Sequence, residues 1–321
     1  MQRSVRTIGF ALTLLLVAAA CSSGGARART APSSSRTGST SSRPTASSNT
    51  TAATPAEPVC GAATSPPPTY RHVVIVMEEN RTWPEVGGVG FTTMPYLHEL
   101  ATKCASYAQW QETNPRQNSL TQYIGLTSGV DNPATVDDCA PSAACSSTDD
   151  NIFRQVRAAG GTARTYVEGA TTGCSAGGGA AKHVPALYYF GADDHSFCPT
   201  EVRPLDELDV DRLPTFVMVI PDLCHDGHDC ENDAVDAWLR SHLGAILGGA
   251  SYRSGTTAVF VLYDEDRPVP NLLIAPTARN GPPAVPGAGH NAALRTIEDM
   301  LGLPALPAVG AAANLRSSAH I

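Results

Sequence analysis

The chain has 321 residues, a net charge of −8 at pH 7 and a sequence pI near 5.5. This length can bury the core of one large domain or of two small ones. The acidic balance excludes the basic surface on which nucleic-acid binding depends, so we expect no nucleic-acid partner.

The first 20 residues predict an export signal. Arg3 and Arg6 precede the apolar run 8–20, which is too short to cross a bilayer. The small residues before Cys21 indicate a lipoprotein signal, in which Cys21 would be acylated and anchor the chain to the outer face of the cell membrane. The leucine that usually stands three residues before such a cysteine is absent, so ordinary cleavage and free secretion stay open. The protein is expected to be exported in either case.

Residues 21–68 are rich in Ser, Thr, Ala and Pro and contain almost no large apolar side chain. Such a segment cannot bury enough surface to offset its ordering entropy, so we predict a disordered tether before a domain at 69–321. Setting Cys21 aside leaves eight cysteines, an even number that predicts disulfides in an exported protein. Short loops favour the pairs Cys139–Cys145, Cys174–Cys198 and Cys224–Cys230, which leaves Cys60–Cys104, although eight cysteines allow 105 connectivities.

The folded part alternates apolar runs with segments of helical spacing. Strands are expected at 73–77, 107–111, 162–167, 214–220 and 257–263, and helices at 95–103, 120–126, 151–160, 234–247 and 291–301. This alternation predicts an α/β domain with a largely parallel central sheet flanked by helices. The sequence leaves the oligomeric state open.

Polar side chains follow three of these strands. Glu78, Glu79 and Asn80 come after the first strand, the run PDLCHDGHDC at 221–230 begins at the end of another, and Asp264 and Glu265 follow the last. Open α/β sheets bind their ligands beyond the carboxyl ends of strands. Carboxylates and imidazoles packed this closely favour a bound divalent cation. The other interpretation of the 221–230 run is a solvated acidic loop held by its two cysteines.

Ser119 stands directly before the helix expected at 120–126. The positive end of a helix favours an anion, so this serine suits a nucleophile that attacks phosphorus. A plain capping serine would occupy the same position. His183, taken alone, is more often a structural residue than a catalytic one.

Six segments in order resemble the bacterial phosphoesterase family, which joins secreted acid phosphatases and phosphatidylcholine-type phospholipases C. They are VVIVMEEN, NSLTQY followed by LTSG, KHVP, PDLCHDGHD, YDED and GHNAALRTIEDMLGL, and they span residues 70–303. The resemblance implies an alkaline-phosphatase-like fold and hydrolysis of phosphate esters. Within the family the chain is most similar to the short secreted acid phosphatases.

By position, the resemblance implies the following site: metal ligands Glu79, Asn80, Asp264 and Glu265, nucleophile Ser119, and further active-site residues His183, Asp226, His228 and His290. The implied reaction is metal-dependent hydrolysis of a phosphomonoester through a serine, with a metal whose identity the sequence leaves open. The chain departs from the family pattern at Asn114, Gln122 and the Arg267-Pro268 pair, and has about three extra residues before Ser119. A lipid-directed phospholipase C and a non-catalytic surface protein on this scaffold therefore remain as alternative functions.

Overall fold

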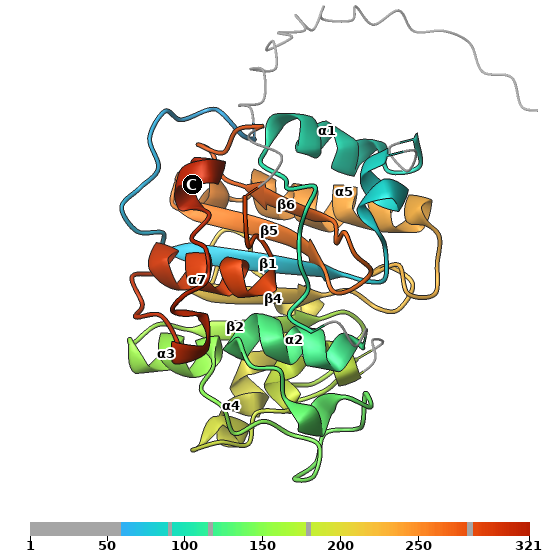
Figure 1. Ribbon diagram of the computed structural model, residues 1–321, viewed down its shortest axis with the longest axis vertical. Helices are drawn as coiled ribbons and strands as arrows, with labels where there is room; N and C mark the ends of the chain where they lie inside the picture. Colours follow the sequence, from blue (N-terminus) through green and yellow to red (C-terminus); the bar gives the residue numbers. More distant parts are fainter. Residues whose placement is uncertain (1–58, 89–91, 115–117, 178–180, 281–284) are drawn as a thin grey trace, which may run out of the picture. The chain divides into compact units, whose positions relative to one another are not determined.

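The computed structural model describes residues 59–88, 92–114, 118–177, 181–280 and 285–321 (Figure 1). The predicted signal, Cys21 and the predicted tether up to residue 58 lie outside these residues, as do 116 and 117 among the extra residues before Ser119. Residues 59–68, the end of the predicted tether, are fixed to the domain. Cys60 is bonded to Cys104, the Ala63 amide donates to the Pro276 carbonyl, and Arg316 donates to the carbonyls of Pro67 and Pro68.

The centre of the domain is a sheet with the strand order β3-β2-β4-β1-β5-β6. Figure 1 shows β2, β4, β1, β5 and β6 in this order from bottom to top. The strands are β1 (His72–Glu78), β2 (Ala163–Val167), β3 (Val202–Pro204), β4 (Phe216–Ile220), β5 (Thr257–Tyr263) and β6 (Asn271–Ile274). Every pair is parallel except β5 with β6. The predicted α/β fold with a largely parallel sheet is confirmed. All residues of β4 and β5 are buried, which explains their continuous apolar runs.

Helices cover both faces of the sheet, as parallel strands require. They are α1 (Pro95–Lys103), α2 (Ser119–Ser128), α3 (Ile152–Ala158), α4 (Asp194–Glu201), α5 (Asn232–Gly248), α6 (Ala250–Arg253), α7 (His290–Met300) and α8 (Arg316–Ala319). α2 packs against α7, on the side turned to the viewer in Figure 1, and α1 packs against α5. The carboxylate of Asp236 in α5 ties these last two helices by accepting the amides of Tyr96 and Leu97.

The strand predicted at 107–111 is wrong. Two isolated β-bridges flank this segment: Ala105, just before it, pairs with Leu273, and Gln111, its last residue, pairs with Gly289. Between them the Tyr107 amide donates to the side chain of Asn271. A continuous strand fails to form because its partners belong to two different elements. The buried Tyr107 and Trp110 therefore belong to an extended segment outside the sheet.

All four predicted disulfides are confirmed: Cys60–Cys104, Cys139–Cys145, Cys174–Cys198 and Cys224–Cys230. Such a set is typical of proteins in an oxidising, extracytoplasmic compartment. Among the described residues, no helix has the length and apolar character needed to cross a membrane.

Candidate active site

Ser119 is the first residue of α2 and is 1% exposed. Its hydroxyl donates to Glu79 Oε2 at 3.1 Å and accepts from the Lys182 ammonium at 3.2 Å. The helix cap is Asn118, so Ser119 does not act as the capping residue. A buried hydroxyl between a proton acceptor and a cation is the environment that activates a serine oxygen.

Glu79 joins Ser119 to a buried histidine. Glu79 Oε2 lies 3.3 Å from His183 Nε2, and His183 Nδ1 lies 3.2 Å from Asp226 Oδ2. All three side chains are at most 1% exposed, and their donor atoms lie within 4.8 Å of one another. Neither ring nitrogen makes a well-aligned hydrogen bond. His183 is therefore at the centre of the group instead of being only a core residue.

The charges in this group determine its protonation. Burial opposes a charged His183, but Glu79 and Asp226 on its two sides raise its pKa to about 9. Burial also opposes ionisation of Glu79, but the charge of His183, with Tyr123 and Lys182, lowers the pKa of Glu79 below its ordinary value. Burial raises the pKa of Asp226, and the charge of Glu79 adds to that effect.

The other predicted metal ligands lie beside this group. Asp264 Oδ1 accepts the Asn80 amide at 3.2 Å, and Asp264 also interacts with Ser119. Burial and the charges of Glu79 and Glu265 raise the pKa of Asp264 well above its usual range. Burial and the charge of Glu79 raise the pKa of Glu265 to about 7. Asn80 has a φ of 40°, in the left-handed region, where the chain turns sharply after β1.

These residues fit a divalent cation. Asn80 Oδ1, Asp264 Oδ2 and Glu265 Oε2 are buried oxygens without a hydrogen-bond donor. Buried acceptors that repel one another are stabilised by a cation, and oxygen donors suit a hard or borderline ion. The structure thus contains Glu, Asp and His side chains that could hold a metal, although its identity is not determined.

The two remaining predicted histidines differ in environment. The His228 side chain is 32% exposed, its Nδ1 lies 2.7 Å from Asp229 Oδ1, and its ring centroid lies 6.1 Å from that of His183. His290 is buried, and its Nε2 must donate to the Tyr263 carbonyl at 3.0 Å, because that oxygen can only accept. Burial lowers the pKa of His290 to about 4, so the ring is neutral and its buried Nδ1 keeps an unpartnered lone pair.

Three residues beside Ser119 and Glu79 were missed by the sequence analysis. Lys182 contacts Ser119 and lies 3.4 Å from Asp138 Oδ2, and Asp138 Oδ1 accepts the amide of Leu120 in the first turn of α2. Tyr123, one turn after Ser119, donates to Glu79 Oε1 at 2.5 Å and stacks on His183. One signal was present for Lys182, since the chain has only one other lysine.

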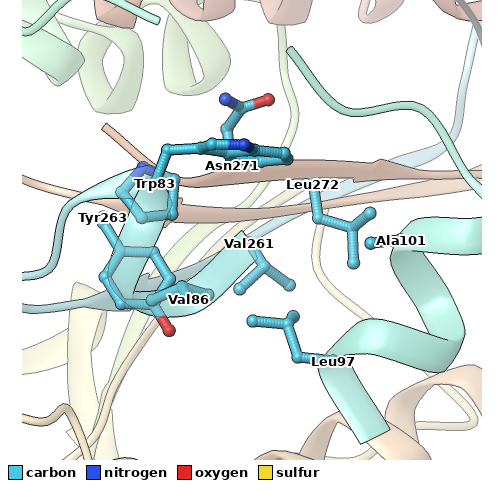
Figure 2. A pocket seen from close by; sticks show the side chains of 9 residues that line it. Trp83, Val86, Leu97, Ala101, Val261, Tyr263, Asn271 and Leu272 are labelled. Atoms are coloured by element: carbon cyan, nitrogen blue, oxygen red, sulfur yellow. The ribbon is translucent and has the colours of Figure 1, made fainter. Parts of the chain in front are cut away.

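A small apolar pocket lies between α1 and the strands β5 and β6 (Figure 2). It is lined by Trp83, Val86, Leu97, Val261, Tyr263 and Leu272, together with Ala101, Pro270 and Asn271. None of the predicted site residues lines it. Tyr263 faces it with its ring, and the carbonyl of the same residue accepts from His290.

The chain is 32% identical over 248 residues to phosphatidylinositol-3-phosphatase from Mycobacterium tuberculosis, covering 74% of this chain and 79% of that protein. The chain belongs to the family of that phosphatase. A scan against models of known protein families finds no match. Membership rests on a relative named for phosphatase activity, and the narrower resemblance to acid phosphatases and phospholipases C stays a prediction.

One solved structure supports the fold. A protein in the alkaline phosphatase superfamily from Vibrio parahaemolyticus superposes with a TM-score of 0.50 at 15% identity, covering 75% of this chain and 69% of that chain. The lipoteichoic acid synthase LtaP from Listeria monocytogenes has a TM-score of 0.44 at 12% identity, covering 74% and 73%. The first of these shows that the sheet and its helices have the alkaline-phosphatase-like arrangement.

Proposed function

We propose that this protein is an exported phosphatase that hydrolyses phosphomonoesters through Ser119, with a divalent metal held by Glu79, Asn80, Asp264 and Glu265. The observation that carries the proposal is the position of the Ser119 hydroxyl, buried at the start of α2 between Glu79 and Lys182. The family relative adds support, since its name specifies a phosphomonoester on a lipid head group.

In the proposed reaction, Ser119 Oγ attacks phosphorus in line with the departing alcohol. The Oγ–P bond forms while the P–O bond to the alcohol breaks, and the serine proton passes to Glu79 Oε2, which accepts its hydrogen bond and orients the hydroxyl. A bound divalent ion would lower the pKa of the serine hydroxyl and balance charge on the phosphoryl oxygens. The Lys182 ammonium adds a fixed positive charge next to Oγ. Water then cleaves the phosphoserine and releases phosphate.

The departing alcohol needs a proton, and His228 is the better of the two histidine candidates. Its side chain is 32% exposed, so it can reach a leaving group, and its Nδ1 lies 2.7 Å from Asp229 Oδ1, which orients the ring. His290 is neutral with its one proton donated to a backbone carbonyl, so it serves better as an acceptor or ligand through Nδ1. His183 stays between Glu79 and Asp226 and positions both.

The test is hydrolysis of p-nitrophenyl phosphate by residues 59–321 across acidic to neutral pH. Ser119→Ala should lower kcat by at least about a thousandfold, as loss of a nucleophile does. Ser128→Ala is the matched control, because Ser128 is equally buried at the other end of α2 and its hydroxyl donates to the Ile124 carbonyl. A Ser119→Ala variant that keeps most of its activity would show that the nucleophile is misassigned.

The alternative activity is hydrolysis of a lipid phosphodiester. If the folded, metal-loaded domain leaves p-nitrophenyl phosphate intact but releases a phosphorylated head group from phosphatidylcholine vesicles, the protein is a phospholipase C. If it cleaves neither substrate, it is a non-catalytic protein on this scaffold. A lipid anchor on Cys21 is proposed on the sequence alone.

A further inference from the structure

A second group of ionisable side chains lies at the same edge of the sheet, on residues that the proposed reaction does not use. Glu168 follows β2, and Asp222 and His225 follow β4. His225 Nδ1 lies 3.0 Å from Glu168 Oε2 and 3.1 Å from Asp222 Oδ1. All three side chains are half-buried, so solvent reaches the group.

The spacing of these donors suits a tetrahedral ion. One donor atom from each residue lies within 4.8 Å of the others. Two ligands bound to one Zn²⁺ at its usual bond lengths lie about 3.3 Å apart, close to the separations found here. Backbone groups orient the carboxylates in advance: Asp222 Oδ1 accepts the amides of Cys224 and His225, and the Asp222 amide donates to Glu168 Oε2. Such secondary bonds fix the ligands in metal sites.

Glu78 provides an independent observation at this place. It is fully buried, and both of its carboxylate oxygens lack a hydrogen-bond partner. The register pairs Val76 with Val219 and Val167 with Ile220, so Glu78 and Glu168 both reach the level of Pro221. Residues at one level of parallel strands point to the same face. Glu78 therefore points to the face that Glu168 occupies, and its carboxyl interacts electrostatically with Asp226 and Glu79 as well as with Glu168.

We propose that Glu168, Asp222 and His225 bind a divalent cation of the zinc type, separate from the ion of the Ser119 site. One imidazole and two carboxylates are donors that zinc accepts. The buried, unpartnered carboxyl of Glu78 lies on the same face as these donors. The assignment stands whether or not Ser119 is the nucleophile.

An ion at this place would fix the loop that carries Asp226. Asp226 follows His225 directly, and its amide donates to the Asp222 carbonyl at 2.9 Å. The Cys224–Cys230 disulfide closes the same loop. The proposed ion thus holds one side of a loop whose other side places Asp226 against His183. The competing explanation is that the His225 ring contacts the two carboxylates directly, without any metal.

The experiment measures bound zinc per chain. Untagged residues 59–321 are stripped with a chelator, dialysed against micromolar Zn²⁺, and analysed by mass spectrometry for zinc. Wild type should hold one more zinc than His225→Gln, and Glu168→Gln should show the same loss. His242→Gln is the matched control, because His242 also stacks on Trp238 but lies outside the group. It should keep the wild-type stoichiometry.

Two further measurements make the outcome decisive. Glu79→Gln, a change in the Ser119 site, should leave the zinc that depends on His225 in place, which separates the two sites. Circular dichroism establishes that each variant is folded, and Glu168→Gln replaces His225→Gln if the latter is not. If folded His225→Gln and Glu168→Gln both bind as much zinc as wild type, the group contains no metal site and the proposal is wrong.

Discussion

The hydrogen bond from Tyr123 to Glu79 should stabilise the folded protein, and Tyr123→Phe measures its contribution to the free energy of unfolding. Tyr123→Phe removes only the phenol oxygen, which donates to Glu79 Oε1 at 2.5 Å, and keeps the ring that stacks on His183. Glu79 is fully buried, so its oxygen loses a donor and water cannot replace it. A hydrogen bond to a charged group contributes about 1.5–3 kcal/mol, and we expect a loss of about 2 kcal/mol. For a domain of this size that corresponds to a fall in Tm of about 4–8 °C.

Urea unfolding followed by circular dichroism measures this loss. Tyr252→Phe is the control, because its hydroxyl donates to a neutral backbone oxygen, the Val59 carbonyl, away from the site. A neutral bond of this kind contributes about 1 kcal/mol. Adding the metal that supports activity should reduce the loss of unfolding free energy in Tyr123→Phe relative to wild type. The loss in Tyr252→Phe should stay the same. Equal losses in both variants, with or without metal, would refute a charged and metal-linked Glu79.

Three further outcomes follow from the site. Lys182→Met should lower kcat for p-nitrophenyl phosphate by about 100-fold with little change in KM, because it removes the cation on the Ser119 oxygen; an unchanged kcat would contradict this role. Burial lowers the pKa of His290 to about 4. On acidification the histidine therefore binds its proton in the unfolded chain before it does so in the folded one. The free energy of unfolding should fall as the pH drops from about 6.5 to 4, by up to about 3 kcal/mol. His290→Gln should flatten the pH dependence of urea unfolding in that window, and a slope equal to that of wild type would contradict it. Prolonged dialysis against EDTA should lower the urea midpoint, and a divalent ion should restore it, whereas no change in either step argues against a metal at Glu79.

The sequence was sufficient for the centre of the sheet and for part of the site. β1, β4 and β5 are buried on both faces, and their apolar runs identify them without any partner information. Because they are parallel, the residues after them meet at one edge. Glu79, Asp226 and Asp264 are therefore brought together by strand position alone.

The remaining features depend on contacts that no local pattern contains. β6 is four residues long and antiparallel, and β3 has three residues, so neither has a period to detect. The order of the strands could not be predicted either, because β1 and β2 are consecutive in the chain but are separated by β4 in the sheet. Ser119 resembled a helix cap because its bond to Glu79 spans 40 positions of the chain. Lys182 meets Ser119 across 63 positions, and only its rarity marked it.

The charges around Ser119 explain why a cation should favour turnover and why protons should compete with that cation. Four carboxylates, those of Glu79, Asp226, Asp264 and Glu265, lie near two cationic side chains, Lys182 and His183. A phosphomonoester brings further negative charge into the same buried space, where screening is weak. A divalent ion offsets two charges at once. Because burial and the charge of Glu79 raise the pKa of Glu265 to about 7, protons compete with the ion for this carboxylate below neutral pH. Raising the ion concentration should therefore move the acidic limb of the pH–rate profile to lower pH, and an acidic limb that does not move would contradict Glu265 as a ligand.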